Sequence, residues 1–285
     1  MILKKEIIEK SKEWKVPPET IDKDWVLGHF LSGFYSINEH KDKLIFKGGT
    51  ALRKCYFPNY RFSEDLDFTS VSNDYKLTRK KLNDVIKIVE RNSGILFDIQ
   101  EIKELNFRDK LVGYQAKIKY WGANHPKNQI PPSPERWMTK IKVEITLFEK
   151  IIFEPENKLI NHPYSDSLIK VNQKIPCYSL NEIIVEKIRA LVQRSYSAPR
   201  DFYDIYFLIN NIKEEEWGNI RRALVDKMKF KGFEYVNFKK LLSTNKVNII
   251  KSAWKSSLEH QIQKEKLPSV ELVIDELEKL FEKYF

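Results

Sequence analysis

Hydrophobic residues among the first 40 positions recur every three or four residues, a spacing that predicts helices. The apolar run LIFK that follows, at residues 44–47, ends in two glycines and is expected to form a buried strand that leads into a turn. The next segment, TALRKCYF, is expected to begin a helix with Thr50 in its first turn. The chain therefore opens with helices, a strand and a further helix.

Three later segments alternate apolar and polar side chains, which is the pattern of a strand that buries one face. They are RFSEDLDFTS, LVGYQAKIKYW and MTKIKVEITLF, at residues 61–70, 111–121 and 138–148. A long helix is expected at residues 76–92, and a loop with three prolines separates the last two segments. Together with LIFK, these segments predict a small mixed sheet with helices.

After about residue 176 the pattern becomes helical. Ser179 and Glu182 form a capping box that opens a helix reaching residue 194, and Pro199 lies in the first turn of the next helix. Further helices are expected at residues 221–228, 238–242, 249–259 and 270–284. The second part of the chain is therefore expected to contain helices and no sheet.

The length of 285 residues is enough for one large domain or two modest ones. We expect an α+β protein with two domains: a mixed β-sheet core with flanking helices at residues 1–175, and a helical domain at residues 176–285. The hydrophobic content of 42% is ordinary for a globular protein, which argues against disorder.

The net charge, the lack of a long apolar stretch and the few cysteines each favour or exclude a class of protein. A formal charge of +10, from 50 basic and 40 acidic residues, predicts a surface that attracts polyanions, although biased genome composition gives the same excess of lysine. No stretch approaches the roughly 18 apolar residues of a membrane span, and the charged start differs from a signal peptide, so we expect no membrane partner and a cytoplasmic location. Two distant cysteines, Cys55 and Cys177, and five scattered histidines argue against a disulfide framework or a structural zinc site.

Asp65 and Asp67 are candidate ligands for a metal ion. Residues two apart in a strand project to the same face, so both carboxylates point one way while Leu66 points toward the core. Their repulsion favours a cation between them, and hard oxygen ligands suit Mg²⁺ or Mn²⁺. Glu144 lies on the polar face of another expected strand, and if the two strands are neighbours it adds a third carboxylate, as in two-metal sites. The alternative is a solvated sheet face.

The turn Gly48-Gly49-Thr50 is a candidate phosphate-binding element. Glycines between a strand and a helix let backbone N–H groups approach an anion, and Thr50 adds a hydroxyl donor. The sequence contains neither a Walker A loop nor a dinucleotide-binding fingerprint. Taken alone, the glycine pair is also consistent with an ordinary turn.

Four charged residues in the two helices after residue 179 are further candidates. Lys187 and Arg194 are seven residues apart and share a helix face, while Arg200 and Asp204 are four apart in the next helix. The alternative is surface charge with an ion pair that contributes little stability. Asp204 stands among aromatic and aliphatic residues, which favours the wall of a cleft over open solvent.

The sequence resembles a known family. The string FKGGTALRKCYFPNYRFSEDLDF, at residues 46–68, is similar to the first two motifs of the AbiEii/AbiGii family of nucleotidyltransferase-like toxins from abortive-infection and toxin–antitoxin pairs. VEKIRALVQR and RDFYDIYFL, at residues 185–194 and 200–208, resemble its third and fourth motifs. The resemblance spans most of residues 20–285 and shows no departure at the core motif positions. It implies an active member with a nucleotidyltransferase-like core.

The resemblance also implies roles for single residues. The expected catalytic residues are Asp65, Asp67, Lys187 and Asp204, of which the first two hold the metal. The expected nucleotide-binding residues are Gly48, Gly49, Thr50, Arg53, Lys187, Arg194 and Arg200. Glu144, the expected third metal ligand, comes from the strand pattern and not from the resemblance.

By the same resemblance, the chain is expected to transfer a nucleotide from an NTP with the help of Mg²⁺ or Mn²⁺. Several members resemble toxins that modify the acceptor end of tRNA and so block translation, and a separately encoded antitoxin that acts on expression is the expected partner. RNA, with tRNA as the first expectation, agrees with the basic charge. Two alternatives stay open: modification of a protein hydroxyl, and a non-catalytic nucleotide-binding module that acts by contact with a partner.

Overall fold

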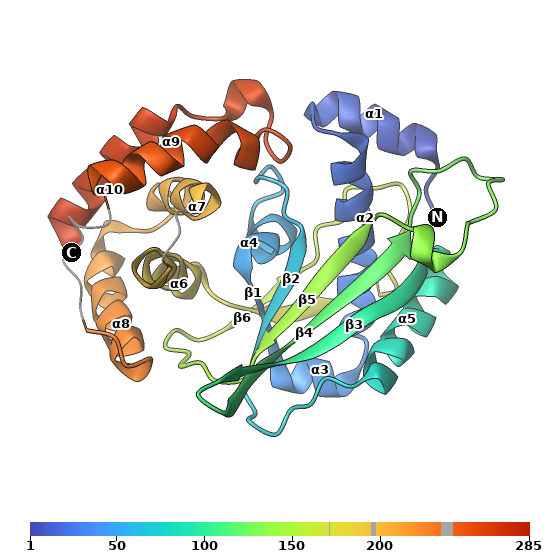
Figure 1. The fold of residues 1–285 in the computed structure, drawn as a ribbon, viewed down its shortest axis with the longest axis horizontal. Helices are drawn as coiled ribbons and strands as arrows, with labels where there is room; N and C mark the ends of the chain where they lie inside the picture. Colours follow the sequence, from blue (N-terminus) through green and yellow to red (C-terminus); the bar gives the residue numbers. More distant parts are fainter. Residues whose placement is uncertain (171, 195–197, 235–241) are drawn as a thin grey trace. The chain divides into compact units, whose positions relative to one another are not determined.

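The computed structural model describes residues 1–170, 172–194, 198–234 and 242–285. These residues form two compact units, and each is described by itself (Figure 1). The first unit contains residues 1–149 and 155–177, and the described strands all belong to it. The second unit contains residues 150–154 and 178–285 and is built from helices.

The first unit is organised around a mixed sheet. Its strands are β1 (Leu44–Lys47), β2 (Asp65–Ser70), β3 (Leu96–Phe107), β4 (Lys110–Trp121), β5 (Lys140–Thr146), β6 (Glu156–Leu159) and β7 (Lys174–Cys177). Their order in the sheet is β3-β4-β5-β2-β1-β7-β6. β2 lies in the middle, where it pairs in parallel with β5 and antiparallel with β1. A parallel pair has to be joined by a crossover, and here the chain between β2 and β5 contains a helix and the long hairpin of β3 and β4.

The expected mixed sheet is confirmed, and three of its seven strands were not anticipated. β1, β4 and β5 lie within the segments expected from the sequence or overlap them closely. β2 begins only at Asp65, so residues 61–64 of the expected strand lie outside it. The strands missed by the sequence pattern are β3, β6 and β7.

Helices of the first unit pack on the sheet and on one another. They are α1 (Lys4–Trp14), α2 (Pro18–Phe34), α3 (Asn38–Lys43), α4 (Gly48–Ala51) and α5 (Arg79–Ser93). α4 continues directly into a π-helical turn at Leu52–Tyr56, and a 3₁₀ turn occupies Pro134–Arg136. α5 starts where the Thr78 hydroxyl accepts the Lys81 N–H and ends at Gly94, whose φ of +73° stops the helix.

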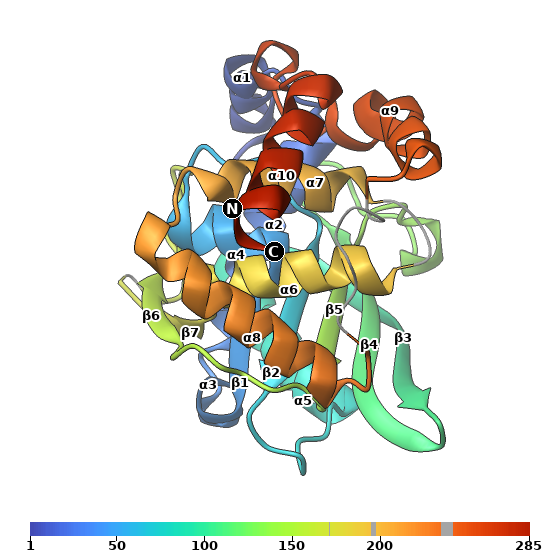
Figure 2. The ribbon, with the colours of Figure 1, turned by 90° about the vertical axis from the view of Figure 1, so that its left-hand side faces the viewer.

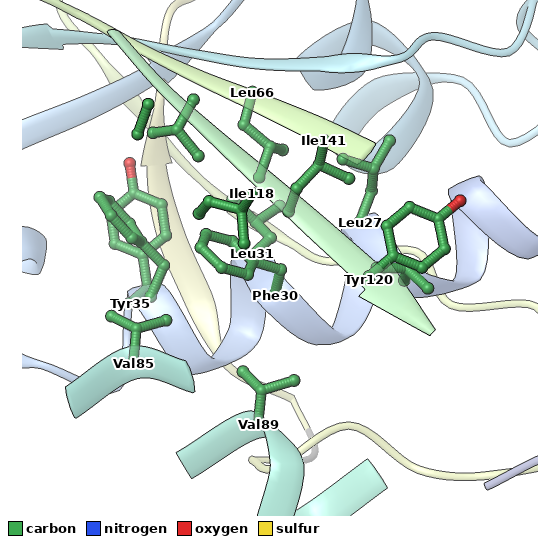
Figure 3. Close-up of a cluster of buried hydrophobic side chains, with 14 of the residues drawn as sticks. Leu27, Phe30, Leu31, Tyr35, Leu66, Val85, Val89, Ile118, Tyr120 and Ile141 are labelled. Atoms are coloured by element: carbon green, nitrogen blue, oxygen red, sulfur yellow. The ribbon is translucent and has the colours of Figure 1, made fainter. Parts of the chain in front are cut away.

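The core of the first unit lies between the sheet and the helices α2 and α5. α2 is apolar around most of its circumference, and 13 of its 17 residues are buried. Figure 3 shows side chains of α2 between those of the sheet and those of α5; the labelled ones are Leu27, Phe30, Leu31, Tyr35, Leu66, Val85, Val89, Ile118, Tyr120 and Ile141. Burial of each large aliphatic side chain contributes roughly 1.5–3 kcal/mol. The packing of this face leaves the polar side chains of β2, β4 and β5 on the opposite face of the sheet.

The second unit is a group of packed helices. They are α6 (Leu180–Gln193), α7 (Pro199–Ile209), α8 (Trp217–Phe230), α9 (Thr244–Leu258) and α10 (Val270–Tyr284), with 3₁₀ turns at Glu214–Glu216 and Lys264–Lys266. α6 packs against α7 and α8, and α7 packs against α9 and α10 (Figure 2). Five of the helices expected after residue 176 are therefore found, while residues 238–241 of the expected helix at 238–242 lie outside the described residues.

The capping box at the start of α6 is present only in part. The Ser179 hydroxyl accepts the Glu182 N–H at 3.3 Å, as expected. The Glu182 carboxylate does not return to the helix start but accepts the N–H groups of Ile152 and Phe153, at 3.1 and 2.9 Å, and forms a fully buried ion pair with Lys227 of α8. Glu182 thus ties residues 150–154 to the helical unit.

None of the described helices combines the length and the apolar character needed to cross a membrane.

One buried histidine makes the stability of the first unit depend on pH. His40 of α3 is fully buried, stacks on the ring of Phe34 at a centroid distance of 4.0 Å, and donates from Nδ1 to the Phe34 carbonyl at 2.9 Å. The described residues offer its Nε2 no hydrogen-bond partner. Protonation would therefore place a charged N–H in an apolar site, and burial lowers the pKa of His40 to about 4.

We expect the free energy of unfolding to fall as the pH drops from about 6.5 toward 4, because the unfolded state then binds a proton that the folded His40 excludes. Between pH 6.5 and 5 this single group accounts for a loss of about 2 kcal/mol. Denaturant unfolding at pH 7 and pH 5 measures it. In His40→Phe, which cannot titrate, the loss should shrink by that amount, and equal losses in the two proteins would contradict the assignment.

Candidate active site

Three carboxylates gather on one face of the sheet. Leu66 and Phe68 of β2 are fully buried in the core, so Asp65 and Asp67 project from the opposite face. The parallel register of β2 and β5 sets Asp67 opposite Glu144, so the two strands are neighbours, as the third-ligand hypothesis requires. The role of these residues remains a proposal, which is taken up below.

Asp67, the middle one of the three carboxylates, has a raised pKa. Burial, together with the neighbouring Asp65 and Glu144, raises the pKa of Asp67 to about 6, although Lys47 and Lys142 oppose the rise. A carboxylate that is hard to ionise beside two others is a site where a bound cation gains much electrostatic energy. Oxygen donors of this kind, from two neighbouring strands, are chemically suited to Mg²⁺ or Mn²⁺.

The glycine turn lies directly against these carboxylates (Figure 1, the start of α4 beside β2). Gly48 has a φ of +82°, and a Cβ added there would lie 2.5 Å from Oδ2 of Asp67. A Cβ on Gly49 would lie 2.8 Å from Nη2 of Arg61 and 3.1 Å from Oγ of Ser63. The absence of both side chains therefore lets the backbone of the turn approach an acidic group and a basic group closely.

The hydroxyl of Thr50 is used inside the protein. Thr50 is buried, and its Oγ1 donates to the carbonyl oxygen of Asp65. This hydrogen bond joins the turn to the first residue of β2. The expected contact of Thr50 with phosphate stays a prediction.

Arg53, which was expected to bind nucleotide, is buried and bound to other residues of the first unit. Its guanidinium is 3% exposed, donates from Nε to Asp24 at 2.9 Å and from Nη1 to the carbonyls of Pro58 and Tyr60, and lies 3.5 Å from the ring centroid of Phe62. Arg53 lies here because Asp24 of α2 is buried, and a buried carboxylate is stable only with a cation as its partner.

The same aspartate is the centre of a buried ion-pair network. Lys54 donates to Asp24 at 2.7 Å, and the Tyr164 hydroxyl donates at 2.8 Å. Burial alone would raise the pKa of Asp24, but Lys54 and Arg53 hold it well below its ordinary value. Arg53 is thus a structural residue that joins the π-helical turn to α2.

In the second unit the charged candidates from α6 and α7 meet in a compact cluster. Nζ of Lys187 lies 2.7 Å from Oδ1 of Asp201 and 2.8 Å from Oδ2 of Asp204, whose side chain is fully buried. Arg194 pairs with the other oxygen of Asp201. Arg200 is half-buried on the same helix, α7. Lys187 and Arg194, expected to share a helix face, therefore share a partner.

A third polar cluster joins α2 to the segment after β6. Asp166 accepts the indole N–H of Trp25 at 3.1 Å and lies 3.1 Å from Nε2 of His29 and 3.0 Å from Nε2 of His162. These three side chains could in principle hold a metal ion, since their ligand atoms lie within 4.8 Å of one another. Metal-binding histidines, however, donate their second N–H to an acceptor. The described residues provide none for Nδ1 of either histidine, and we interpret the cluster as a structural hub in which both Nε2–H groups donate to Asp166.

With the geometry described, the sequence can be compared with known proteins. Residues 29–276 match the family described as nucleotidyl transferase AbiEii toxin of type IV toxin–antitoxin systems. The chain belongs to the AbiEii family. The resemblance stated from the motifs is thereby confirmed, and the chain is a nucleotidyltransferase of a toxin family. No curated protein sequence matches it significantly.

Solved structures agree with this family at the level of the fold. The chain is similar to MenT4, a nucleotidyltransferase toxin of Mycobacterium tuberculosis, with a TM-score of 0.62 and 17% sequence identity over 99% of this chain and 89% of that chain. A putative nucleotidyltransferase from H. pylori is 18% identical, with a TM-score of 0.49 over 90% of this chain and 91% of that chain. The similarity to MenT4 confirms the expected α+β fold class.

Sequence reasoning missed three residues at these clusters. Lys142 of β5 lies among the carboxylates, Asp201 of α7 binds both Lys187 and Arg194, and Arg61 reaches the glycine turn. Asp201 could have been found, because it is three residues before Asp204 and so shares its helix face. Lys142 could not, since its position depends on the register between two strands far apart in the sequence.

We expect Gly48→Ala to reduce nucleotide transfer by at least about 10²-fold, because the new Cβ displaces either the turn or the Asp67 carboxylate. Gly232→Ala is the matched control: Gly232 also has a positive φ, of +75°, but a Cβ there would meet no atom within 4 Å. Both variants carry the backbone strain of a positive φ, Gly48→Ala carries the steric clash in addition, and only Gly48→Ala should lose activity. Equal activity of the two variants would remove the turn from the site.

Proposed function

We propose that this AbiEii protein transfers a nucleotide from an NTP to a hydroxyl of RNA, with Asp65, Asp67 and Glu144 as ligands for Mg²⁺ or Mn²⁺. The observation that carries the proposal is the register of β2 and β5, which brings the three carboxylates together beside the turn at Gly48. When bound there, a divalent cation neutralises charge on the triphosphate and on the attacking oxygen. The protein's own groups supply position and electrostatics.

Backbone N–H groups of the turn at Gly48, Gly49 and Thr50 are proposed to hold phosphate oxygens. Their support is the room left by the missing Cβ atoms and the nearby Arg61 guanidinium. In the transfer the acceptor hydroxyl loses its proton to solvent and its oxygen bonds to the α-phosphorus. The bond from the α-phosphorus to the oxygen that bridges to the β-phosphorus breaks, and pyrophosphate leaves. Fixing the triphosphate in line with the acceptor is therefore the main task of these residues.

Lys187 and Asp204 are proposed to act in the same reaction, as parts of the helical domain at residues 176–285. The support is chemical: Lys187 is held by Asp201 and Asp204, so its ammonium has a fixed position, while Arg194 adds charge at the edge of the cluster. A fixed cation binds phosphate oxygens both in the substrate complex and in the transition state. Arg200 is proposed to add to the same positive field.

The acceptor is proposed to be tRNA at its acceptor end, so that transfer blocks translation. The formal charge of +10 supports a polyanionic acceptor. The toxin family implies an antitoxin as the partner, and we propose that it is separately encoded and acts on expression of this chain. A cytoplasmic location is part of this proposal, because tRNA and NTPs are found there.

Incubation with each labelled NTP, Mg²⁺, total RNA and protein extract tests the acceptor. We expect label in a tRNA-sized band that disappears after ribonuclease treatment. Label that survives ribonuclease and enters protein would favour a protein hydroxyl as the acceptor. Binding of NTP without transfer to any macromolecule would favour a non-catalytic module.

Asp67→Asn should lower transfer by at least about 10²-fold while the fold survives, because one metal ligand is lost without a change in side-chain volume. Glu101→Gln is the matched control, since Glu101 is a half-buried acidic residue of β3 that pairs with Lys103 and Lys117, outside the carboxylate group. Its transfer rate should equal that of the wild type. Full activity of Asp67→Asn in EDTA-treated buffer would contradict the metal site.

Lys187→Met is expected to raise the KM for NTP and lower kcat together. It also removes the ammonium group that lies 2.8 Å from the fully buried Asp204 carboxylate, which costs stability in its own right. Lys227→Met separates the two effects, because Lys227 is fully buried against Glu182 and Glu186 of the same unit. This control should unfold at a lower temperature and keep its KM. A KM unchanged in Lys187→Met at a temperature where both variants are folded would assign Lys187 a structural role only.

A further inference from the structure

Lys142 places an ammonium group among the carboxylates. It lies on β5 directly opposite Asp65 of β2 and two residues before Glu144. Its Nζ is 3.2 Å from Oδ2 of Asp65 and 3.6 Å from Oε2 of Glu144. The ammonium thus contacts two of the three groups that are proposed to hold the divalent cation.

The neighbouring strand β4 also limits where the Lys142 side chain can lie. On its far side the register of β4 and β5 sets Lys117 opposite Lys142, and like charges in this position repel. Lys117 turns away to Glu101 of β3, at 3.1 Å, where Lys103 also pairs. Repulsion by Lys117 of β4 and attraction by Asp65 of β2 therefore favour the same position of the Lys142 ammonium, next to Asp65 and Glu144.

We propose that Lys142 is a built-in counter-ion of the active site, which a divalent cation displaces and which then binds the phosphates of the incoming nucleotide. This inference rests on the proposed metal site. The displaced ammonium and a divalent cation a few ångströms apart repel, so the metal alone binds weakly. A triphosphate carries enough negative charge to bind both, and its arrival removes the penalty.

The consequence is a thermodynamic coupling between metal and nucleotide. Each ligand increases the affinity for the other by the same factor, because both act on one displacement of Lys142. A protein without this ammonium would lack that part of the coupling.

The test is the binding of Mn²⁺ to the full chain, followed by electron paramagnetic resonance, without nucleotide and with a saturating α,β-methylene NTP, which cannot transfer its nucleotide. The proteins are the wild type, Lys142→Gln, Lys117→Gln and Asp67→Asn. Lys117→Gln removes a similar charge from the next strand and serves as the matched control. Thermal unfolding checks that each variant folds.

We expect Lys142→Gln to bind Mn²⁺ alone on the order of tenfold more tightly than the wild type, because one cation has been removed from the site. With the nucleotide analogue bound, the difference should shrink to about threefold or less. Lys117→Gln should follow the wild type in both conditions to within about twofold, the effect of a paired surface charge.

Two results would overturn the inference. Equal or weaker Mn²⁺ binding by Lys142→Gln without nucleotide would show that Lys142 does not compete with the metal. An unchanged ratio between Lys142→Gln and wild type with and without the analogue would show that Lys142 does not couple the two ligands. In either case a loss of Mn²⁺ in Asp67→Asn leaves the proposed metal site standing. Equal Mn²⁺ binding by Asp67→Asn and wild type would reject the metal site and this inference together.

Discussion

The parallel pairing of β2 with β5 is the constraint on which the carboxylate site depends. It forces Asp67 and Glu144 to be direct neighbours and leaves Asp65 on the same face. Like charges held this close destabilise the folded protein, and burial adds to that cost, so that both raise the pKa of Asp67. The cost is offset on the other face of the same strands, where Leu66 and Phe68 are fully buried. The core thus makes a local repulsion tolerable, and the repulsion makes the site receptive to cations.

Buried ion pairs give both units their internal order. In the first unit Asp24 of α2 holds Arg53 and Lys54, and in the second Glu182 of α6 holds Lys227. Removing one partner of such a pair is strongly destabilising, because a charge is then left without compensation in an apolar environment. These pairs hold the π-helical turn that follows the glycine turn of α4, and the first turn of α6, the helix that carries Lys187.

The sequence predicted the parts of the fold in which local pattern and burial agree. β5 and the second half of β4 alternate because one face is buried, and α6 begins at a recognisable cap. β3 was missed because much of it is exposed on both faces, so that LFDIQEIKELNF carries no clean alternation. β6 and β7 have four residues each, too few for a period to be read. Such strands are defined by their partners and not by their own side chains.

Some residues of the candidate site could likewise be predicted from the sequence, and others could not. Motifs located Asp65, Asp67, Lys187 and Asp204, because a resemblance carries information about residue types in order. The resemblance carried no information about burial. It could not show that the Arg53 guanidinium, which it assigned to a nucleotide, is buried and donates to Asp24. The position of Lys142 required the register between β2 and β5, which follows from tertiary packing.

Because the ion pairs are buried, dissolved salt affects them less than it affects exposed charges. Dissolved salt screens exposed charges over a Debye length of about 8–10 Å, but it reaches buried pairs such as Asp24 with Lys54 much less. A rise in salt therefore weakens interactions of the exposed charged side chains while it leaves the internal pairs largely intact. The ionic strength at which exposed charges are screened is thus lower than the one at which the two units lose their buried pairs.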